Sequence, residues 1–214
     1  MRTIMVLNAK GGCGKSTIAT NLASYFAWEE ERTVALADYD PQGSSREWLM
    51  ARGEEWPEIR GIDGTSRTPE RLPRDTEIMI IDAPARVQGK ELTALVRRAE
   101  TIIIPVLPSP IDMRAAAHFI KDLLIIGKIS RAQTKVAVVA NRVRENTCVY
   151  ESLYKFLRHL KIPFIATLRD TQNYIRAAER GVGIYELAPS LTYQDVEQWE
   201  PLIRWIRSKR SRAA

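Results

Sequence analysis

Apolar runs alternate along the chain with segments of helical periodicity. The runs consist mainly of β-branched and long aliphatic residues and cover residues 3–7, 33–37, 78–81, 101–104, 135–139 and 163–166. Between several of them, apolar residues recur every three or four positions, as they do on one face of a helix. Strands followed by helices of ten or more residues predict an α/β fold with a mostly parallel, twisted sheet and helices on both faces.

A glycine-rich segment follows the first predicted strand. It reads A-K-G-G-C-G-K-S-T over residues 9–17, and apolar residues continue after it at helical spacing. A turn that leads from a strand into a helix leaves backbone N–H groups pointing at one spot, and such a concavity binds anions. The pattern G-x-x-x-x-G-K-[ST] fits except at its first position, which is Ala9. The sequence therefore predicts a phosphate-binding loop.

The loop pattern predicts a role for each of its polar residues. Lys15 would bind the β- and γ-phosphates, Ser16 would coordinate Mg²⁺, and Thr17 would bind the α-phosphate. The backbone that cradles the phosphates is predicted to come from Gly11, Gly12, Cys13 and Gly14. Lys10 is a second lysine, which a simple phosphate cradle does not require.

Polar residues follow three further predicted strands. The strand at 33–37 is followed by Asp38 and Asp40, the strand at 78–81 by Asp82, and the strand at 135–139 by Asn141. Ligands of parallel sheets bind beyond the carboxyl ends of the strands, so these side chains are expected beside the loop. Asp82 is placed to hold Mg²⁺ through water, and Asn141 has the paired donor and acceptor that suit the edge of a base. Each Asp could instead cap a helix or a turn.

Length and composition indicate one ordinary α/β domain over residues 1–214. Hydrophobic residues make up 45% of the chain and charged residues 27%, and no apolar run approaches the length of a membrane span. Neither of the two cysteines belongs to a metal-ligand spacing, and both fit a reducing compartment. We expect a cytoplasmic protein.

The excess of positive charge is concentrated near the C-terminus. The formal net charge is +6, and after Glu200 five basic residues occur without an acid. A basic tail from about residue 204 favours a polyanionic partner, either nucleic acid or an anionic membrane. The alternative is a solvated terminus without a partner.

Together these motifs resemble the ParA/MinD family of deviant Walker A ATPases, and within it the small ParA-type partition and positioning ATPases. The resemblance rests on K-G-G-x-G-K-[ST]-T at 10–17, D-x-D-P-Q at 38–42, the apolar Walker B strand ending at Asp82, P-x-x-P-x-P-x-D at 105–112 and the pair Asn141 and Arg142. It spans roughly residues 1 to 185 and implies a P-loop NTPase fold with ATP and Mg²⁺ as cofactors.

The resemblance also implies how the site works. Two ATP molecules would be buried in a sandwich homodimer, with Lys10 reaching the phosphates bound by the other subunit. Lys10, Lys15 and Asp40 would be catalytic, with Asp40 positioning or activating the attacking water. Ser16 would coordinate Mg²⁺, Asp82 would hold the water molecules bound to it, and Asp38 would support the metal site from behind these ligands. Arg142 and Asn141 would bind the nucleotide.

Such dimers bind DNA without sequence preference and are released when a ParB-like or other adaptor stimulates hydrolysis. The resemblance thus implies a nucleoid-associated protein that segregates or positions a cargo, which could be a plasmid, a chromosome region or a protein body. Candidate DNA contacts are the basic residues of the last helical segments and the tail, namely Arg169, Arg176, Arg180, Lys209 and Arg210.

Two other functions remain open at this level. A MinD-like ATPase would bind a membrane through a C-terminal amphipathic helix, and here Val196, Trp199, Leu202, Ile203 and Ile206 share one helical face. Acidic residues in the same segment disfavour an anionic membrane, and we expect this stripe to pack on the protein's own core. A metabolic phosphoryl-transfer enzyme on the same fold would need a substrate pocket instead of a second subunit.

Overall fold

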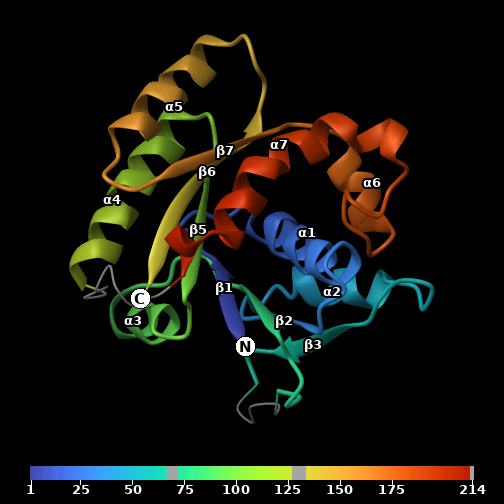
Figure 1. The fold of residues 1–214 in the computed structure, drawn as a ribbon. Helices are drawn as coiled ribbons and strands as arrows, with labels where there is room; N and C mark the ends of the chain where they lie inside the picture. Colours follow the sequence, from blue (N-terminus) through green and yellow to red (C-terminus); the bar gives the residue numbers. More distant parts are fainter. Residues whose placement is uncertain (67–71, 127–133, 213–214) are drawn as a thin grey trace.

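The computed structural model describes residues 1–66, 72–126 and 134–212. Within these residues, one sheet of seven parallel strands has the order β3-β2-β4-β1-β5-β6-β7 (Figure 1). The strands are β1 (Arg2–Val6), β2 (Val34–Asp38), β3 (Ile59–Asp63), β4 (Ile78–Asp82), β5 (Thr101–Val106), β6 (Lys135–Val143) and β7 (Phe164–Arg169). The predicted parallel α/β architecture is confirmed, and each of the six apolar runs contributes a strand.

Helices cover both faces of the sheet (Figure 1). One face carries α1 (Lys15–Trp28), α2 (Ser44–Ala51), α6 (Asn173–Glu179) and α7 (Pro189–Arg207), and the other carries α3 (Gly89–Val96), α4 (Pro110–Ile126) and α5 (Cys148–His159). A hydrophobic core lies on each face of the sheet, and alternate residues of a strand pack into one core or the other, because successive side chains point to opposite faces. In β1, Ile4 and Val6 pack towards α1, whereas Met5 packs towards α3 and α4.

The strand β3 was missed by the sequence prediction. It reads I-R-G-I-D, with a charged residue and a glycine inside it, and its side chains alternate poorly between buried and exposed. As an edge strand it pairs only with β2, so one side needs no neighbour and polar residues are tolerated. A search for continuous apolar runs therefore passes over it.

The apolar stripe of α7 packs on the protein's own core. Trp199, Leu202, Ile203 and Ile206 are at most 2% exposed and belong to the same buried hydrophobic cluster as residues of α1 and the sheet. Trp199 also donates its indole N–H to the hydroxyl of Tyr174, at 2.8 Å. This confirms the expected packing of the stripe. Among the described residues, no helix combines the length and the hydropathy needed to cross a bilayer.

The sheet register gathers the predicted acids at one edge. Val6 at the end of β1 pairs with Asp82 of β4, and Asp38 of β2 pairs with the same Asp82. Because β4 lies between β1 and β2, the loop after β1 and the acids after β2 and β4 open on one side of the molecule.

Candidate functional site

The glycine-rich loop is fixed by its backbone conformation and by Asn141. Gly12 and Gly14 have φ angles of 73° and 89°, which favour glycine. A Cβ on Gly14 would lie 2.2 Å from Nδ2 of Asn141, so this glycine also permits a close approach. Asn141, at the carboxyl end of β6, donates Nδ2 to the carbonyl of Cys13 at 2.8 Å. The amide thus holds the loop, and a contact with a base stays a prediction.

Contacts within the loop fix its first half. Asn8 is buried and donates Nδ2 to the carbonyl of Pro105 at 2.7 Å, and its Oδ1 accepts the backbone N–H of Lys10 at 3.2 Å. The thiol of Cys13 donates to the carbonyl of Lys10 at 3.3 Å, and burial raises the pKa of this thiol. Cys13 therefore contributes a neutral packing group, as a small-residue position would require.

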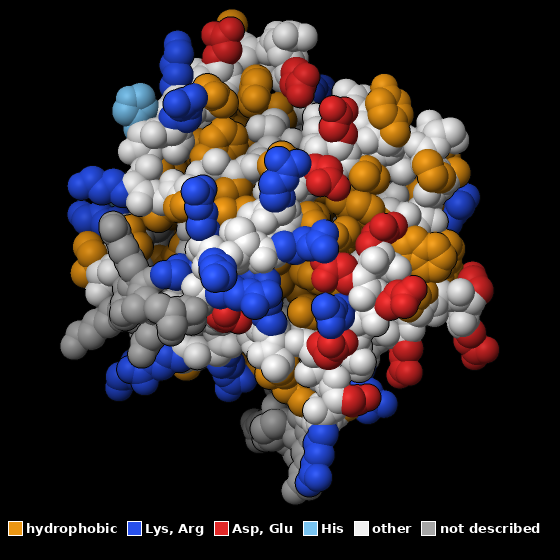
Figure 2. All heavy atoms as spheres, in the orientation of Figure 1, with side chains coloured by type: hydrophobic (Ala, Val, Ile, Leu, Met, Phe, Trp, Pro, Cys, Tyr) orange, Lys and Arg blue, Asp and Glu red, His pale blue; other side chains and the backbone are white. Residues whose placement is uncertain are grey.

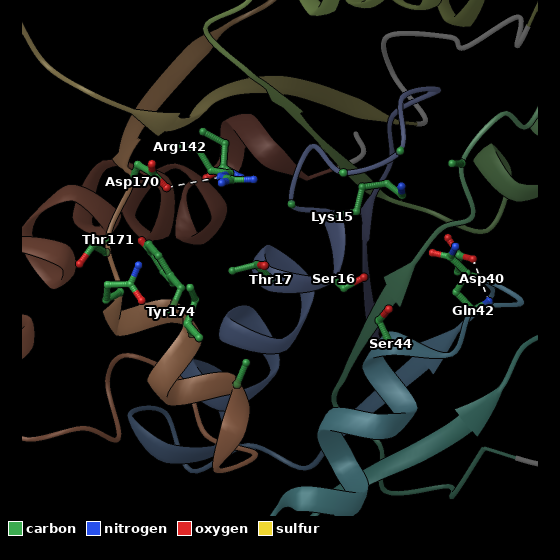
Figure 3. A pocket seen from close by; sticks show the side chains of 18 of the residues that line it. Lys15, Ser16, Thr17, Asp40, Gln42, Ser44, Arg142, Asp170, Thr171 and Tyr174 are labelled. Carbon is green, nitrogen blue, oxygen red and sulfur yellow. Dashed lines mark hydrogen bonds and ion pairs between the residues drawn. The ribbon is translucent and has the colours of Figure 1, made fainter.

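An open cavity of about 1020 Å³ lies over the loop. Its floor is the start of α1, where Lys15, Ser16 and Thr17 lie (Figure 3). One wall comes from residues 40–42 and 44, and the opposite wall includes Arg142 and residues 169–172 and 174. The cavity thus joins the carboxyl ends of β2, β4, β6 and β7 around a helix N-terminus, the arrangement that binds nucleotide phosphates.

The two lysines of the loop have different positions. Lys15 is 6% exposed, lines the cavity, and lies 3.5 Å from the carbonyl of Lys10 through its Nζ. Lys10 is half-buried and is not among the residues that line the cavity. In the described part of the chain, its ammonium has no carboxylate partner. Within the described residues of the single chain, no acid compensates its charge.

Asp82 is a fully buried carboxylate at the end of β4. Its Oδ2 accepts the hydroxyl of Ser45 at 2.7 Å, whereas its Oδ1 is buried without a hydrogen-bond partner among the described residues. Burial raises the pKa of Asp82 to about 6, and the hydroxyls of Ser16 and Ser45 oppose this rise. An orphaned carboxylate oxygen beside a phosphate loop fits a cation. Mg²⁺ prefers such oxygen ligands, so Asp82 and Ser16 are the residues that would hold it.

Asp38 and Asp40 organise the loop that leads into α2. Asp38 is buried and accepts the backbone N–H groups of Asp40, Ser45 and Arg46 at 2.9, 3.0 and 3.1 Å. It thereby stabilises the N-terminus of α2, and a contact with the metal's waters stays a prediction. Asp40 lines the cavity, where its Oδ1 accepts the N–H of Gln42 at 3.0 Å (Figure 3). Among the described residues, its Oδ2 has no such partner.

The wall opposite Asp40 contains residues that the sequence analysis did not name. Asp170 pairs with Arg142 at 3.4 Å and with Arg144 at 3.1 Å, and Thr171 and Tyr174 follow beside the cavity (Figure 3). They come directly after β7, so the rule that ligands bind beyond strand ends could have identified them. Arg142 lines the cavity with its guanidinium next to Asp170, and its contact with a nucleotide stays a prediction.

The predicted DNA contacts fall on two separate surfaces. Arg176 and Arg180 are exposed on and just after α6, close to the cavity, whereas Lys209 and Arg210 are exposed in the short helix η1 (Lys209–Ser211). The helix η1 lies at the amino ends of the strands, because Ser211 bonds to Arg2 and Thr101. Figure 2 shows Lys and Arg side chains gathered on this second surface, over the end of α7.

Arg169 differs from the other candidates, since its guanidinium pairs with the buried carboxylate of Asp195 and bonds to Gln194. Its charge is therefore compensated within the chain, and it lines the cavity.

Comparisons with known proteins agree with this geometry. The family model described as the CobQ/CobB/MinD/ParA nucleotide binding domain matches residues 4–184. Maintenance of carboxysome distribution protein A of Gloeobacter kilaueensis is 30% identical over 192 residues, covering 86% of this chain and 84% of the relative. The protein of the same name from Halothiobacillus neapolitanus is 26% identical over 191 residues, covering 86% and 87%.

A solved structure shows the fold independently. A plasmid partition protein of Borrelia burgdorferi, bound to AMPPNP, superposes with a TM-score of 0.73 at 16% identity and covers 95% of this chain and 98% of its own. At this identity the likeness concerns the fold alone, which is the P-loop NTPase fold predicted from the sequence.

Proposed function

Since the chain belongs to the CobQ/CobB/MinD/ParA nucleotide-binding domain family, we propose that it is a Mg²⁺-dependent ATPase of the ParA type. In this proposal it forms an ATP-sandwich homodimer, binds nonspecific DNA on the nucleoid and positions or segregates a cargo. An adaptor protein stimulates hydrolysis and thereby releases the dimer from DNA.

The observation that carries the proposal is the position of Lys10. One lysine of the loop, Lys15, lines the cavity of its own chain, while the ammonium of Lys10 has no carboxylate partner among the described residues and does not line that cavity. An uncompensated cation beside an anion site favours a second anion, and the phosphates bound by another copy of the chain supply one. Lys10 would then act in trans, as an arginine finger does.

The chemistry follows from the groups around the loop. A water oxygen forms a bond to the γ-phosphorus, the bond from that phosphorus to the β,γ-bridging oxygen breaks, and the electron pair leaves with ADP. One proton of the water stays on the phosphate and the other passes to solvent. Asp40 has an oxygen available to orient this water, and Lys15 and Lys10 stabilise the charge on the phosphates. Mg²⁺, held by Ser16 and Asp82, would neutralise part of the same charge.

DNA binding is proposed for the exposed arginines and lysines that no acid in the described chain neutralises. Arg176 and Arg180 near the cavity, and Lys209 and Arg210 at the far end of the sheet, meet this condition. Dimerisation doubles each basic surface, so ATP would raise the affinity for phosphates of DNA. Arg169 is a weaker candidate because Asp195 compensates its charge.

The cargo is proposed only as a class. Two relatives that each cover 86% of the chain are named for the maintenance of carboxysome distribution, which supports a positioning function. A protein body, a plasmid or a chromosome region would each be carried by the same ATP cycle, and the adaptor decides between them.

Sedimentation with DNA and with anionic liposomes tests the proposal. We expect wild-type protein to pellet with plasmid DNA in ATP and much less in ADP, and not to pellet with liposomes, because the apolar stripe of α7 is buried. Lys10→Ala should abolish the ATP-dependent DNA binding, and Lys121→Ala, an exposed lysine of α4, should not.

Three results would contradict the proposal. Binding to liposomes would favour a membrane-associated ATPase, and equal DNA binding in ATP and ADP would remove the nucleotide switch. Unchanged turnover of a small phosphoryl acceptor by Lys10→Ala would favour a metabolic enzyme.

A further inference from the structure

The segment after β4 attaches an arginine to the rim of the cavity. Ala83 donates its N–H to the carbonyl of Val6 at 3.2 Å, and Arg86 donates its N–H to the carbonyl of Ala9 at 3.0 Å. These bonds hold residues 83–86 against the end of β1 and the first residue of the glycine-rich segment. Arg86 itself lines the cavity.

The backbone of Arg86 is in the left-handed region, with a φ of 62°. This conformation is unfavourable for a residue with a Cβ, and glycine would adopt it without that cost. Strained residues of this kind cluster at functional sites, where a contact of the side chain offsets the strain. A ligand bound by the guanidinium of Arg86 would offset this strain.

Arg86 also differs from the other arginines that line the cavity. Arg142 and Arg144 both pair with Asp170, and Arg169 pairs with Asp195. Arg86 is exposed, and within residues 1–66, 72–126 and 134–212 its guanidinium has neither a carboxylate partner nor a hydrogen-bond partner. It is the cavity's one arginine in the described chain whose charge is not compensated.

The position of Arg86 indicates which part of a nucleotide it would meet. It follows β4, the strand that ends in Asp82, and β4 lies next to β2, whose end leads to Asp40. Asp82 and Asp40 are the residues assigned to the metal and the attacking water, so this side of the loop receives the terminal phosphate. Arg142, at the carboxyl end of β6, and Tyr174, which follows β7, lie on the other side (Figure 3).

We propose that Arg86 binds the terminal phosphate of the nucleotide in its own cavity, as a cation that distinguishes ATP from ADP and stabilises the charge of phosphoryl transfer. This inference rests on the proposed ATPase function. The guanidinium contacts the oxygens of the terminal phosphate while the water oxygen bonds to the γ-phosphorus and the bridging oxygen leaves with ADP, and it takes no part in these bond changes. Arg86 thus acts within one subunit, whereas Lys10 acts across the dimer.

The test compares Arg86→Gly with Arg86→Lys and with Arg97→Ala, an exposed arginine just after α3 that lacks a carboxylate partner in the described chain. Arg86→Gly removes the side chain and relieves the left-handed backbone, so its Tm should not fall below that of the wild type. We expect its single-turnover ATPase rate, measured with DNA present, to fall about 100-fold or more. Arg86→Lys should recover part of the rate, and Arg97→Ala should match the wild type.

Nucleotide affinities separate this role from a structural one. Isothermal titration should show ATP binding to Arg86→Gly weakened about tenfold or more, as expected when a charged partner is lost, with ADP binding within about twofold of the wild type. The same comparison made in the Lys10→Ala background isolates the single subunit. The selective loss should persist there, since Arg86 acts in its own cavity.

Other outcomes overturn the inference. A turnover rate within twofold of the wild type, or an equal loss of ATP and ADP affinity with a lower Tm, would show that Arg86 has no phosphate role. Loss of the effect in the Lys10→Ala background would place the contact across the dimer instead. If the wild type did not hydrolyse ATP, the proposed function would fail, whereas the affinity comparison would still decide the role of Arg86.

Discussion

Replacing Asp82 by asparagine should stabilise the metal-free protein at neutral pH. The carboxylate is fully buried, and burial raises its pKa from 3.8 to about 6. At about 1.4 kcal/mol for each pKa unit, its ionisation destabilises the folded state by roughly 3 kcal/mol at pH 7. Asparagine removes the charge and can still accept the hydroxyl of Ser45, so up to about 3 kcal/mol should be regained.

The effect should depend on pH in a defined direction. Because the raised pKa means that the folded state binds the proton of Asp82 more tightly than the unfolded state, wild-type stability falls as the pH rises from about 4 through 6. The difference between Asp82→Asn and the wild type should therefore be less than about 1 kcal/mol near pH 4 and reach its full value by pH 7.

Urea denaturation in EDTA at several pH values measures this difference. Asp122→Asn, at an exposed position of α4, is the matched control and should stay within about 0.5 kcal/mol of the wild type at every pH. When the EDTA is replaced by Mg²⁺ and ATP, the metal should stabilise the wild type and have little effect on the stability of Asp82→Asn. If Asp82→Asn were less stable than the wild type at pH 7, or if the difference in stability between the two proteins did not vary with pH, the assignment of Asp82 as a buried, destabilising carboxylate that binds the metal would be wrong.

Three further substitutions test other parts of the account. Gly14→Ala should abolish ATP binding in isothermal titration and lower the free energy of unfolding in urea denaturation by about 1–3 kcal/mol, because its Cβ would meet Asn141 at 2.2 Å on a backbone with a φ of 89°. Wild-type affinity for ATP would contradict the described loop. Arg52→Ala should lower the free energy of unfolding by about 3–5 kcal/mol in the same denaturation assay, because it leaves the buried carboxylate of Glu186 without its ion-pair partner. A loss below about 1 kcal/mol would refute this. Arg176→Ala should lower the slope of log affinity for DNA against log salt by about 1, and an unchanged slope would remove this residue from the interface.

The sequence predicted the central strands and the residues that follow them. Central parallel strands are buried on both faces, so they occur as continuous apolar runs, and a polar residue directly after such a run is conspicuous. Asp82 and Asn141 were found in this way, and so was the position of the glycine-rich loop. The edge strand β3, which contains Arg60 and Gly61, lacks this pattern because only one side of it is paired.

Contacts between distant residues could not be predicted from the pattern. Asn141 binds the carbonyl of Cys13, 128 residues away, and Arg169 pairs with Asp195 of α7. Which partner a polar side chain finds depends on how the elements pack, and spacing along the chain does not record it. For the same reason, the basic residues predicted to bind DNA could not be divided into two surfaces before the fold was known.

Sedimentation velocity in ATP and in ADP tests the proposed sandwich dimer most directly. We predict that the wild type is a dimer in ATP and a monomer in ADP, and that Lys10→Ala remains a monomer in both although it still binds ATP. A wild-type monomer in saturating ATP and Mg²⁺ that hydrolyses ATP at the same rate per chain at every protein concentration would contradict the account, because Lys10 would then complete no second site.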